Sequence, residues 1–177
     1  MELVEPSKQY KDSFIEAVKE FQTDKDFPLQ KSWYHDFSIE NLVGDFASFV
    51  EKQLSEARGE NLPEGYVPQT NYWLVDGGEF VGAVRIRQRL NDHLMQIGGH
   101  IGYAIRPSRR RRGYGKKIME LALGKAKEMG IARVRITCDA DNDASRKIIE
   151  QNGGLFDSCI PNPETGVDKL LYWIKTG

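Results

Sequence analysis

Hydrophobic residues recur at helical spacing in two stripes along the first third of the chain. One stripe follows the helix-start signal Pro6–Ser7 and predicts a helix that stops before the irregular residues 24–33. The other follows Ser38 and predicts one continuous helix that ends near Gly59. The apolar positions of the two stripes are Tyr10, Phe14, Ile15, Val18 and Phe21, and then Leu42, Val43, Phe46, Phe49, Val50 and Leu54.

The middle of the chain changes from helical spacing to short β-prone runs. Residues 72–75 and 80–87 flank a Gly-rich turn and predict a hairpin, and residues 100–105 predict a third strand. A short strand at residues 3–4 precedes the helices. Residues 60–70 are rich in Pro and Gly, so we expect a surface loop of the length that often carries function.

Helix and strand patterns alternate in the second half. The predicted elements are a helix over 118–129 closed by Gly130, a strand over 132–137, a helix over 144–151, and strands at 155–156 and 170–174. A strand, helix, strand order implies a parallel crossover and therefore a layered α/β architecture. Because 177 residues suit one hydrophobic core, we predict a single domain over residues 1–177.

The charges of the chain nearly cancel. Lys and Arg number 25 against 26 Asp and Glu, so the formal net charge is -1 and predicts no general attraction to nucleic acid or membrane. Cys138 and Cys159 lie in no metal-like spacing, and we expect free thiols, no metal and a reducing cytoplasm. The first residues lack the pattern of a leader, and no apolar run approaches the ~20 residues of a membrane span. We therefore expect a soluble cytoplasmic protein.

An arginine-rich turn over residues 105–117 carries the strongest functional signal. A strand-like run stops at Pro107, and Gly113-Tyr114-Gly115 opens a helix. The unpaired N–H groups and dipole of a helix start suit a phosphate, and Gly permits close backbone approach. The spacing matches neither a P-loop nor a complete dinucleotide fingerprint. A solvated basic turn, a nucleic-acid patch and a targeting signal stay open as alternatives.

The turn resembles the acetyl-CoA motif of the GNAT superfamily of N-acetyltransferases, Arg/Gln-x-x-Gly-x-Gly/Ala after a strand and a proline. Residues 110–115 match this motif by position, and Asn142-Asp143-Ala144-Ser145 resembles a later segment of the family. Residues 98–103, 142–145 and 152–154 together are similar to a subgroup of predicted acetyltransferases of unknown substrate. The resemblance implies a mixed, mostly antiparallel sheet of six to seven strands with a parallel, splayed central pair and about four flanking helices.

The resemblance also implies an acetyl-CoA site without a metal. It assigns the pyrophosphate to backbone N–H groups of Arg110, Arg111, Arg112, Gly113, Tyr114 and Gly115, with Lys116 nearby. It assigns main-chain contacts with the pantetheine and acetyl group to Ile105, and places Asn142 and Ser145 on the other side of the pantetheine. A helix N-cap is an equally good reading of Asn142.

The implied chemistry is direct attack of a primary amine on the thioester carbonyl, with a main-chain N–H stabilising the oxyanion. The family's general-acid tyrosine is replaced by Ile149. His100 is the candidate base, against the more ordinary role of a histidine hydrogen-bonded within the sheet. Tyr103 is the second candidate, and Cys138 is a further proton donor or a small buried hydrophobe.

The acceptor is expected between the first helices and the long loop. Aromatic residues there can enclose an amine, and acids at helix starts can attract a basic substrate or serve the helix dipole. These residues are Trp33, Tyr34, His35, Tyr66, Tyr72 and Trp73, and the acids are Asp36, Glu40 and Asp45. Three hypotheses follow: an N-acetyltransferase of a small-molecule or peptide amine, acting as a monomer or homodimer; an acyl-CoA-sensing module of the same fold; and a nucleic-acid or phosphate binder, which the charge balance disfavours.

Overall fold

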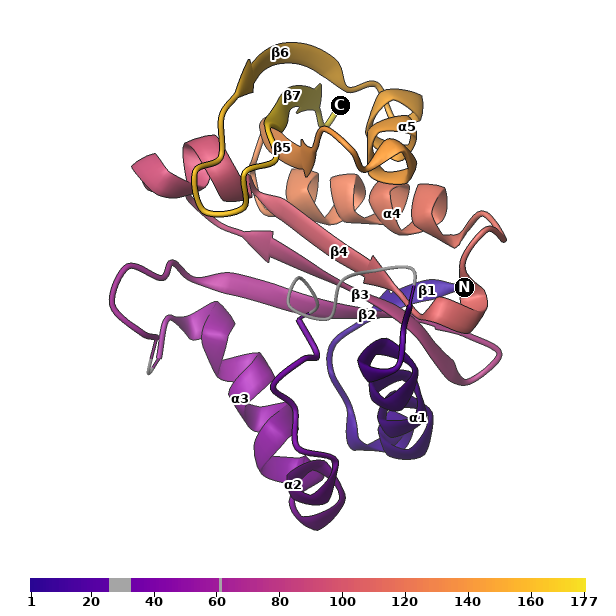
Figure 1. Cartoon of the computed structure of the whole chain (residues 1–177). Helices are drawn as coiled ribbons and strands as arrows, with labels where there is room; N and C mark the ends of the chain where they lie inside the picture. The colour runs from indigo at the N-terminus through magenta and orange to yellow at the C-terminus, as the bar shows by residue number, and fades with distance from the viewer. Residues whose placement is uncertain (26–32, 61) are drawn as a thin grey trace.

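Seven strands form two antiparallel sheets in this computed structural model, which describes residues 1–25, 33–60 and 62–177 (Figure 1). The first sheet has the order β1-β2-β3-β4 and the second β5-β7-β6. The strands are β1 (Glu2–Val4), β2 (Gln69–Asp76), β3 (Glu79–Arg87), β4 (Ile101–Ile105), β5 (Arg133–Asp139), β6 (Leu155–Ile160) and β7 (Lys169–Lys175). All of the predicted strands are therefore confirmed.

The helices lie on both sides of the first sheet (Figure 1). They are α1 (Lys11–Gln22), α2 (Ile39–Gly44), α3 (Phe46–Arg58), α4 (Tyr114–Glu128) and α5 (Asp143–Gln151), with short turns η1 (Lys8–Tyr10), η3 (Leu94–Gly98) and η4 (Pro107–Arg109). α1, α2 and α3 lie on one side of the first sheet, and α4 lies between that sheet and the second one. Most of the predicted irregular stretch at residues 24–33 lies outside the described residues.

The prediction of one continuous helix from Ser38 to Gly59 was wrong. The structure breaks it at Asp45, which has φ -140° and ψ 67° and begins α3 as its N-cap. The Asp45 carboxylate accepts a hydrogen bond of 3.0 Å from the Ser48 N–H. Gly44 weakens the helix just before this cap, so capping outweighs the apolar stripe. Asp45 thus serves as the N-cap of α3, the ordinary role for an acid at a helix start.

The two sheets meet where β4 lies beside β5. The His100 N–H donates to the Arg135 carbonyl at 2.7 Å, and farther along both strands Tyr103 lies near Cys138. From the first contact to the second, the residue number rises along both strands, so β4 and β5 run parallel. Because the remaining lengths of β4 and β5 belong to separate sheets, the predicted splayed pair is confirmed. It divides what the sequence suggested as one mixed sheet into sheets of four and three strands.

The first sheet buries a hydrophobic core on each face. On one face Ile101, Ile105 and Val84 pack against Ile118 and Met119 of α4. On the other face lies an aromatic cluster centred on Phe14 of α1. Its other members are Phe46 and Phe49 of α3, Trp73 of β2, Phe80 of β3, and Tyr34. The alternation along β4 agrees with the sequence, since Ile101, Tyr103 and Ile105 face α4 while Ala104 faces α1.

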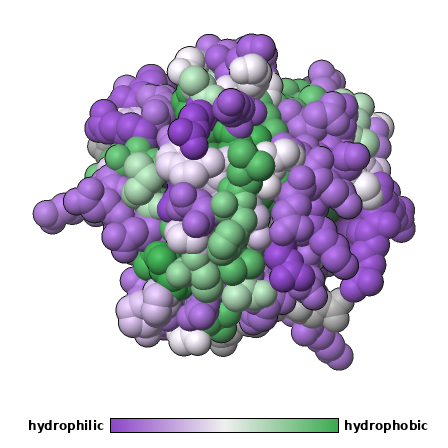
Figure 2. All heavy atoms as spheres, turned by 90° about the horizontal axis from the view of Figure 1, so that it is seen from above, coloured by the Kyte–Doolittle hydropathy of each residue, from purple (hydrophilic) through white to green (hydrophobic). Residues whose placement is uncertain are grey.

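Apolar surface also crosses the face of the molecule that is seen from above, between hydrophilic regions (Figure 2). On β6, Leu155 and Phe156 are 69% and 59% exposed. Among the described helices, none combines the length and hydrophobicity that crossing a bilayer requires.

We predict that Phe14→Ala lowers the free energy of unfolding by about 3–5 kcal/mol. Phe14 is 1% exposed and stacks on Trp73 at a ring-centroid distance of 4.7 Å, so truncation leaves a cavity inside the cluster. Urea unfolding followed by circular dichroism measures the change. Phe156→Ala is the matched control and should cost under about 1 kcal/mol because that ring is largely exposed. Equal losses in the two variants would contradict the assigned core.

Candidate functional site: an open strand edge beside a helix start

In the described part of the chain, the outward edge of β4 faces the opening between the sheets without a strand partner. Gly102 and Ala104 lie opposite Arg85 and Ala83 of β3. Because the Arg87 N–H donates to the His100 carbonyl and the Arg106 N–H to the Val81 carbonyl, the even positions of β4 bond to β3. Hydrogen-bonding direction alternates along a strand, so the backbone groups of residues 101, 103 and 105 point the other way. Such an edge can pair with an extended polar ligand.

The turn between β4 and α4 forms a cradle of N–H groups at the end of this edge. Gly113, with φ 83°, is the N-cap of α4, and Arg111 has φ 59°. The first bond into the helix is Lys117 N–H to Gly113 carbonyl at 3.1 Å. Within the described parts of the chain, the N–H groups of residues 111–116 meet no protein acceptor. They and the helix dipole together suit an anion such as a phosphate.

The two glycines of the motif have different roles. A Cβ at Gly113 would meet no atom within 4 Å, so this position needs glycine for its positive φ and leaves the space in front of it open. A Cβ at Gly115 would lie 2.5 Å from Cδ1 of Ile148 on α5. Gly115 therefore serves the close packing of α4 on α5. Tyr114 anchors the same turn by donating its hydroxyl to Asp76 at 2.7 Å.

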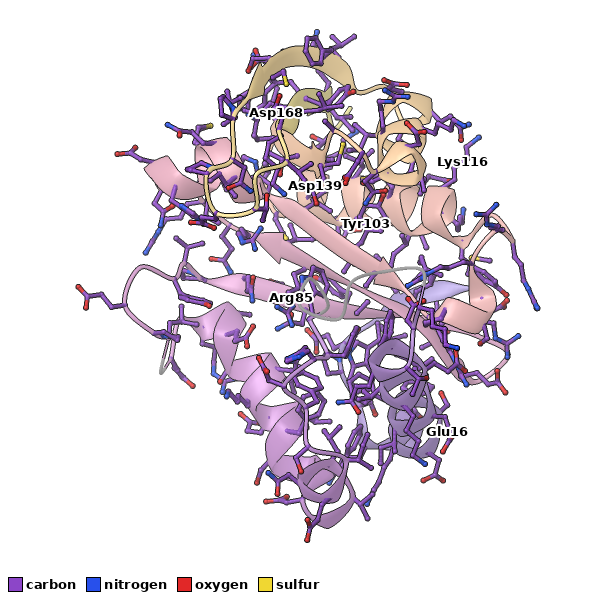
Figure 3. All side chains as sticks on the ribbon, in the orientation of Figure 1. Glu16, Arg85, Tyr103, Lys116, Asp139 and Asp168 are labelled. Carbon is purple, nitrogen blue, oxygen red and sulfur yellow. The ribbon has the colours of Figure 1, made fainter. Side chains whose placement is uncertain are left out.

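The side chains of the arginine run divide into an anchored and a free pair. Arg109 pairs with Glu79, and Arg110 pairs with Asp24 at 2.6 Å. Arg111 and Arg112 are exposed, and no described carboxylate pairs with either. Lys116 is also exposed, on the first turn of α4 (Figure 3). The free cations add positive potential around the cradle, while the anchored ones hold it in place.

Tyr103 and Ser145 come together across the opening. The Tyr103 hydroxyl lies 3.1 Å from the Ser145 Oγ, and Tyr103 lies on β4 below α5 (Figure 3). Burial raises the pKa of Tyr103 to about 12, so its phenol stays protonated. Asn142 is the N-cap of α5, and its Oδ1 accepts from the Ser145 N–H at 2.9 Å. Asn142 thus positions Ser145 at the opening.

Ile149 contributes no polar atom to this opening. It is 0% exposed and packs in the core, where a Cβ on Gly154 would lie 2.5 Å from its Cγ2. Cys138 is buried, and burial raises the pKa of its thiol to about 11. Cys138 is thus protonated at neutral pH and lies beside Tyr103.

His100 lies at the closed end of the opening. Its Nδ1 accepts the Arg135 N–H at 2.8 Å, which makes the neutral ring a donor through Nε2. Burial and, less strongly, the positive charge of Arg87 lower the pKa of His100. The N–H donated to Nδ1 also favours the neutral ring, because a protonated ring could not accept it. The sequence offered two roles for His100, a catalytic base and a hydrogen bond within the sheet. The structure shows the hydrogen bond.

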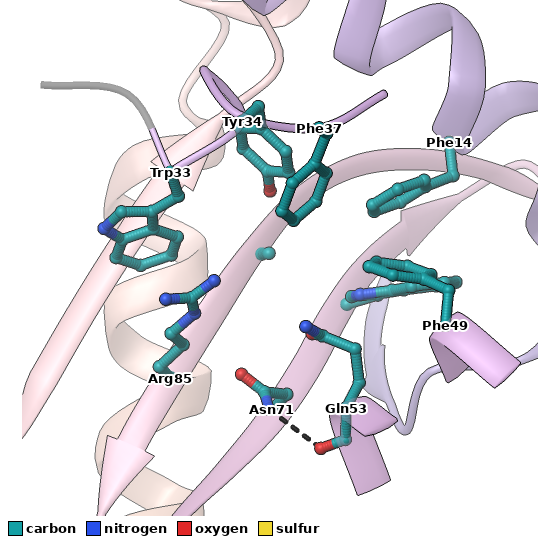
Figure 4. Close-up of a pocket in the computed structure, with 10 residues that line it drawn as sticks. Phe14, Trp33, Tyr34, Phe37, Phe49, Gln53, Asn71 and Arg85 are labelled. Carbon is teal, nitrogen blue, oxygen red and sulfur yellow. Dashed lines mark hydrogen bonds between the residues drawn. The ribbon is translucent and has the colours of Figure 1, made fainter. Parts of the chain in front are cut away.

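A small hollow lies on the other face of the first sheet, between β3 and the α1–α3 layer (Figure 4). Of the aromatic residues predicted for the acceptor, Trp33, Tyr34 and Trp73 line it, whereas Tyr72 faces Lys125 of α4 and Tyr66 is 65% exposed. Three polar residues also line the hollow, Gln53, Asn71 and Arg85, and no sequence pattern pointed to them.

His35 and Asp36 make an exposed pair of their own at 2.6 Å. In the described part of the chain, no three His, Cys, Asp or Glu side chains gather as metal ligands would.

Comparison with known proteins adds a family and a fold. Residues 16–153 match the sequence model of the acetyltransferase (GNAT) family. No curated protein sequence matches the chain.

Solved structures of acetyltransferases share the fold. The self-immunity acetyltransferase MccE of microcin C7, in complex with acetyl-CoA and AMP, aligns with a TM-score of 0.71 at 15% identity over 98% of this chain and 91% of its own. RimL, a ribosomal L7/L12 α-N-protein acetyltransferase in complex with coenzyme A, aligns with a TM-score of 0.71 at 18% identity. The alignment covers 98% of this chain and 92% of RimL. Mycobacterium smegmatis RimJ, in complex with a CoA disulfide, aligns with a TM-score of 0.68 at 18% identity. The alignment covers 96% of this chain and 79% of RimJ.

We predict that His100 titrates below its ordinary pKa and is neutral, with the proton on Nε2, at pH 7. Two-dimensional NMR of the imidazole nitrogens measures both properties. As the pH falls from about 7.5, the unfolded chain binds this proton first, at about 6.5, so the stability contributed by neutral His100 declines with acidification. A pKa above 6.5, or a proton on Nδ1, would contradict the Arg135 contact.

Proposed function

Because this chain belongs to the GNAT acetyltransferase family, we propose that it transfers the acetyl group of acetyl-CoA to a primary amine of a small molecule or peptide. The observation that carries the proposal is the unpaired β4 edge leading into the N–H cradle of residues 111–116. An extended chain that ends in a diphosphate fits this arrangement, and coenzyme A has that form.

In this proposal the pyrophosphate lies at the start of α4. The N–H groups of residues 111–116 donate to it, and Arg111, Arg112 and Lys116 add unpaired positive charge. Arg110 acts differently from the expectation, because its side chain is held by Asp24 and by the Ile105 carbonyl at 3.3 Å. Its guanidinium holds the turn in place, and Arg110 would contribute to the ligand site through its backbone.

The pantetheine would run along β4 as an additional strand. The backbone groups of Ile105 and Tyr103 on the outward edge supply the hydrogen bonds. Asn142 and Ser145 border the opposite wall from the start of α5. This placement directs the thioester toward the closed end, where β4 and β5 converge at His100.

The reaction is attack of the neutral amine on the thioester carbonyl, which forms the C–N bond and then breaks the C–S bond to release the thiolate. A main-chain N–H on the outward edge of β4 stabilises the oxyanion. We propose that the paired hydroxyls of Tyr103 and Ser145 deliver the proton to the departing sulfur. A thiol pKa of about 8.5 makes this leaving group only about 2 kcal/mol unfavourable at neutral pH, so modest acid assistance suffices.

The amine must also lose a proton, and His100 is the candidate base. Its lowered pKa keeps the ring neutral at pH 7. For Nδ1 to take the proton, however, it must exchange the Arg135 N–H for the substrate or a water. The proposed base therefore acts at the expense of one of the contacts that close the opening.

We predict that acetyl-CoA is consumed with a primary amine and that Tyr103→Phe lowers kcat by about 10²-fold. The phenylalanine keeps the ring but loses the hydroxyl that contacts Ser145, so the affinity for CoA should change by less than about 3-fold. Thiol release measures turnover, and calorimetry measures CoA binding. Tyr10→Phe, on η1 and away from the opening, is the control. Saturable CoA binding without turnover on any amine would instead support an acyl-CoA sensor.

We predict that Gly113→Val weakens CoA binding at least about 10-fold, while Arg109→Ala weakens it less than about 3-fold. Valine disfavours the φ of 83° and projects into the open space before the cradle, whereas Arg109 is held by Glu79. Gly124→Val, also in α4 and with no atom within 4 Å of its Cβ, is the matched control and should leave affinity unchanged. The reverse order of the first two affinities would refute the backbone cradle.

A further inference from the structure

Arg85 is a half-buried cation that no described carboxylate neutralises. It lies on β3, and its guanidinium stacks over the Trp33 ring at 4.3 Å from the centroid (Figure 4). Two other shielded arginines have acidic partners, since Arg106 pairs with Glu20 at 2.7 Å and Arg135 with Asp157 at 2.7 Å. Arg87, which has no described carboxylate partner, donates instead to the Gly98 and Gly99 carbonyls. A shielded guanidinium without either kind of partner keeps its five donors available for an anion.

Asn71 places an unsatisfied acceptor in the same hollow. Its side chain is 4% exposed, and its amide nitrogen donates to the Gln53 carbonyl at 2.9 Å and to the Glu56 carboxylate at 2.8 Å. These two bonds fix the amide orientation and turn Oδ1 toward Arg85 (Figure 4). Among the described residues no donor reaches this buried oxygen. A buried acceptor without a partner is destabilising, so this oxygen is suited to a ligand or water donor.

The hollow lies one strand away from the proposed thioester. Arg85 is directly opposite Gly102 of β4, and neighbouring strands are about 4.8 Å apart. A Cβ on Gly102 would lie 2.8 Å from the Trp33 ring. Trp33 therefore contacts both the middle of β4 and the Arg85 guanidinium. A group bound at Arg85 would therefore hold the rest of its molecule close to the middle of β4.

The enclosed part of the hollow has a volume of about 10 Å³, about the room that one water molecule needs. Including the part that opens to solvent, the space is about 240 Å³. The enclosed part can therefore take one water-sized polar atom, and the rest of a bound group would lie in the part that opens to solvent. Because Arg85 already occupies the Trp33 face, a cationic group would meet a like charge there.

We propose that the acceptor amine carries an anionic group, a carboxylate or a phosphate, that binds Arg85, while a ligand N–H or a water donates to the Asn71 Oδ1. This inference rests on the proposed function and names its acceptor class. The Arg85 fork matches both kinds of anion, and the Tyr34 hydroxyl also points into the hollow (Figure 4). The bound anion orients the free amine toward the acetyl group, so Arg85 is a specificity residue.

Matched pairs of amines test this assignment on the intact protein. The pairs are β-alanine with β-alaninamide, glycylglycine with its amide, and phosphoethanolamine with ethanolamine. Thiol release from acetyl-CoA gives kcat/KM, and thermal stabilisation of the CoA-saturated protein gives binding without turnover. We expect at least one anionic member to exceed its neutral partner about 10-fold or more in both readouts. The pair that responds distinguishes carboxylate from phosphate.

In Arg85→Gln this preference should fall to within about 2-fold, while CoA affinity stays unchanged. Arg133→Gln is the matched control, because Arg133 also lies over a tryptophan ring, Trp173, at 4.9 Å but on β5. Arg85→Lys keeps the charge and should retain part of the binding preference, which separates loss of the cation from loss of folding.

Three results would overturn the proposal: equal response to both members of every pair, no response to any member, or a preference that persists in Arg85→Gln. If CoA binds and the anionic amines bind without turnover, the acceptor assignment stands and the proposed catalysis fails. If CoA does not bind, the proposed function itself fails, and the amine-binding readout on the CoA-free protein still decides the role of Arg85.

Discussion

The separation of β4 from β5 is the constraint on which the rest of the site depends. Two hydrogen bonds between His100 and Arg135, one through the backbone and one through Nδ1, close the opening at one end. η3 strengthens this end, because Thr137 donates to the Ile97 carbonyl at 2.9 Å and Arg135 donates to the Met95 carbonyl at 3.2 Å. Beyond it, the strands enter different sheets, and no other described strand pairs with the outward edge of β4. Unpaired strand edges are a liability that proteins usually cover, so an edge left open inside a fold indicates a ligand.

The cradle depends on the same separation, since α4 has to begin where the opening is widest. Links to the first sheet and to α1 hold it there. Arg106 binds Glu20 of α1, whose second oxygen also accepts the Ser108 N–H at 3.0 Å, and Tyr114 binds Asp76 at the end of β2. Burial opposes ionisation of Glu20, but these bonds outweigh it and lower the pKa of the carboxyl. The arginine run therefore combines side chains that fix the turn with N–H groups that remain available.

The sequence predicted what depends on neighbouring residues. The helix stripes, the hairpin and the Gly-x-Gly turn are local patterns, and each gave an element at nearly the right place. The break at Asp45 does not show in the hydrophobic pattern, because the apolar stripe continues through it and the deciding feature is the capping bond from Ser48 to Asp45. Family membership and the fold followed from the motif and the element order.

What the sequence could not predict joins distant segments. Arg85 and Trp33 come from different layers of the fold, so no spacing rule connects them. Asn71 has an unsatisfied oxygen only because Gln53 and Glu56 of α3 occupy its amide nitrogen. Likewise, the bond from Arg135 to His100 Nδ1 requires β4 and β5 to meet at one register. Arg85 and Asn71 are ordinary residue types for a strand. Only the packing of the first sheet against α3 and Trp33 makes their polar atoms available to a ligand.

The choice of arginine at position 85 is consistent with a site that handles a reactive acyl donor. A lysine in this hollow would present a primary amine beside the proposed thioester and would compete with the acceptor whenever it lost its proton. An arginine supplies the same charge but offers no nucleophilic amine, because the guanidinium keeps its proton in proteins. Of the described residues that line the hollow, none is a lysine. A bound anion also fixes the acceptor at one end, which reduces the entropic cost of bringing its amine to the carbonyl. The same residue can thus select the acceptor and favour its productive orientation without becoming a substrate itself.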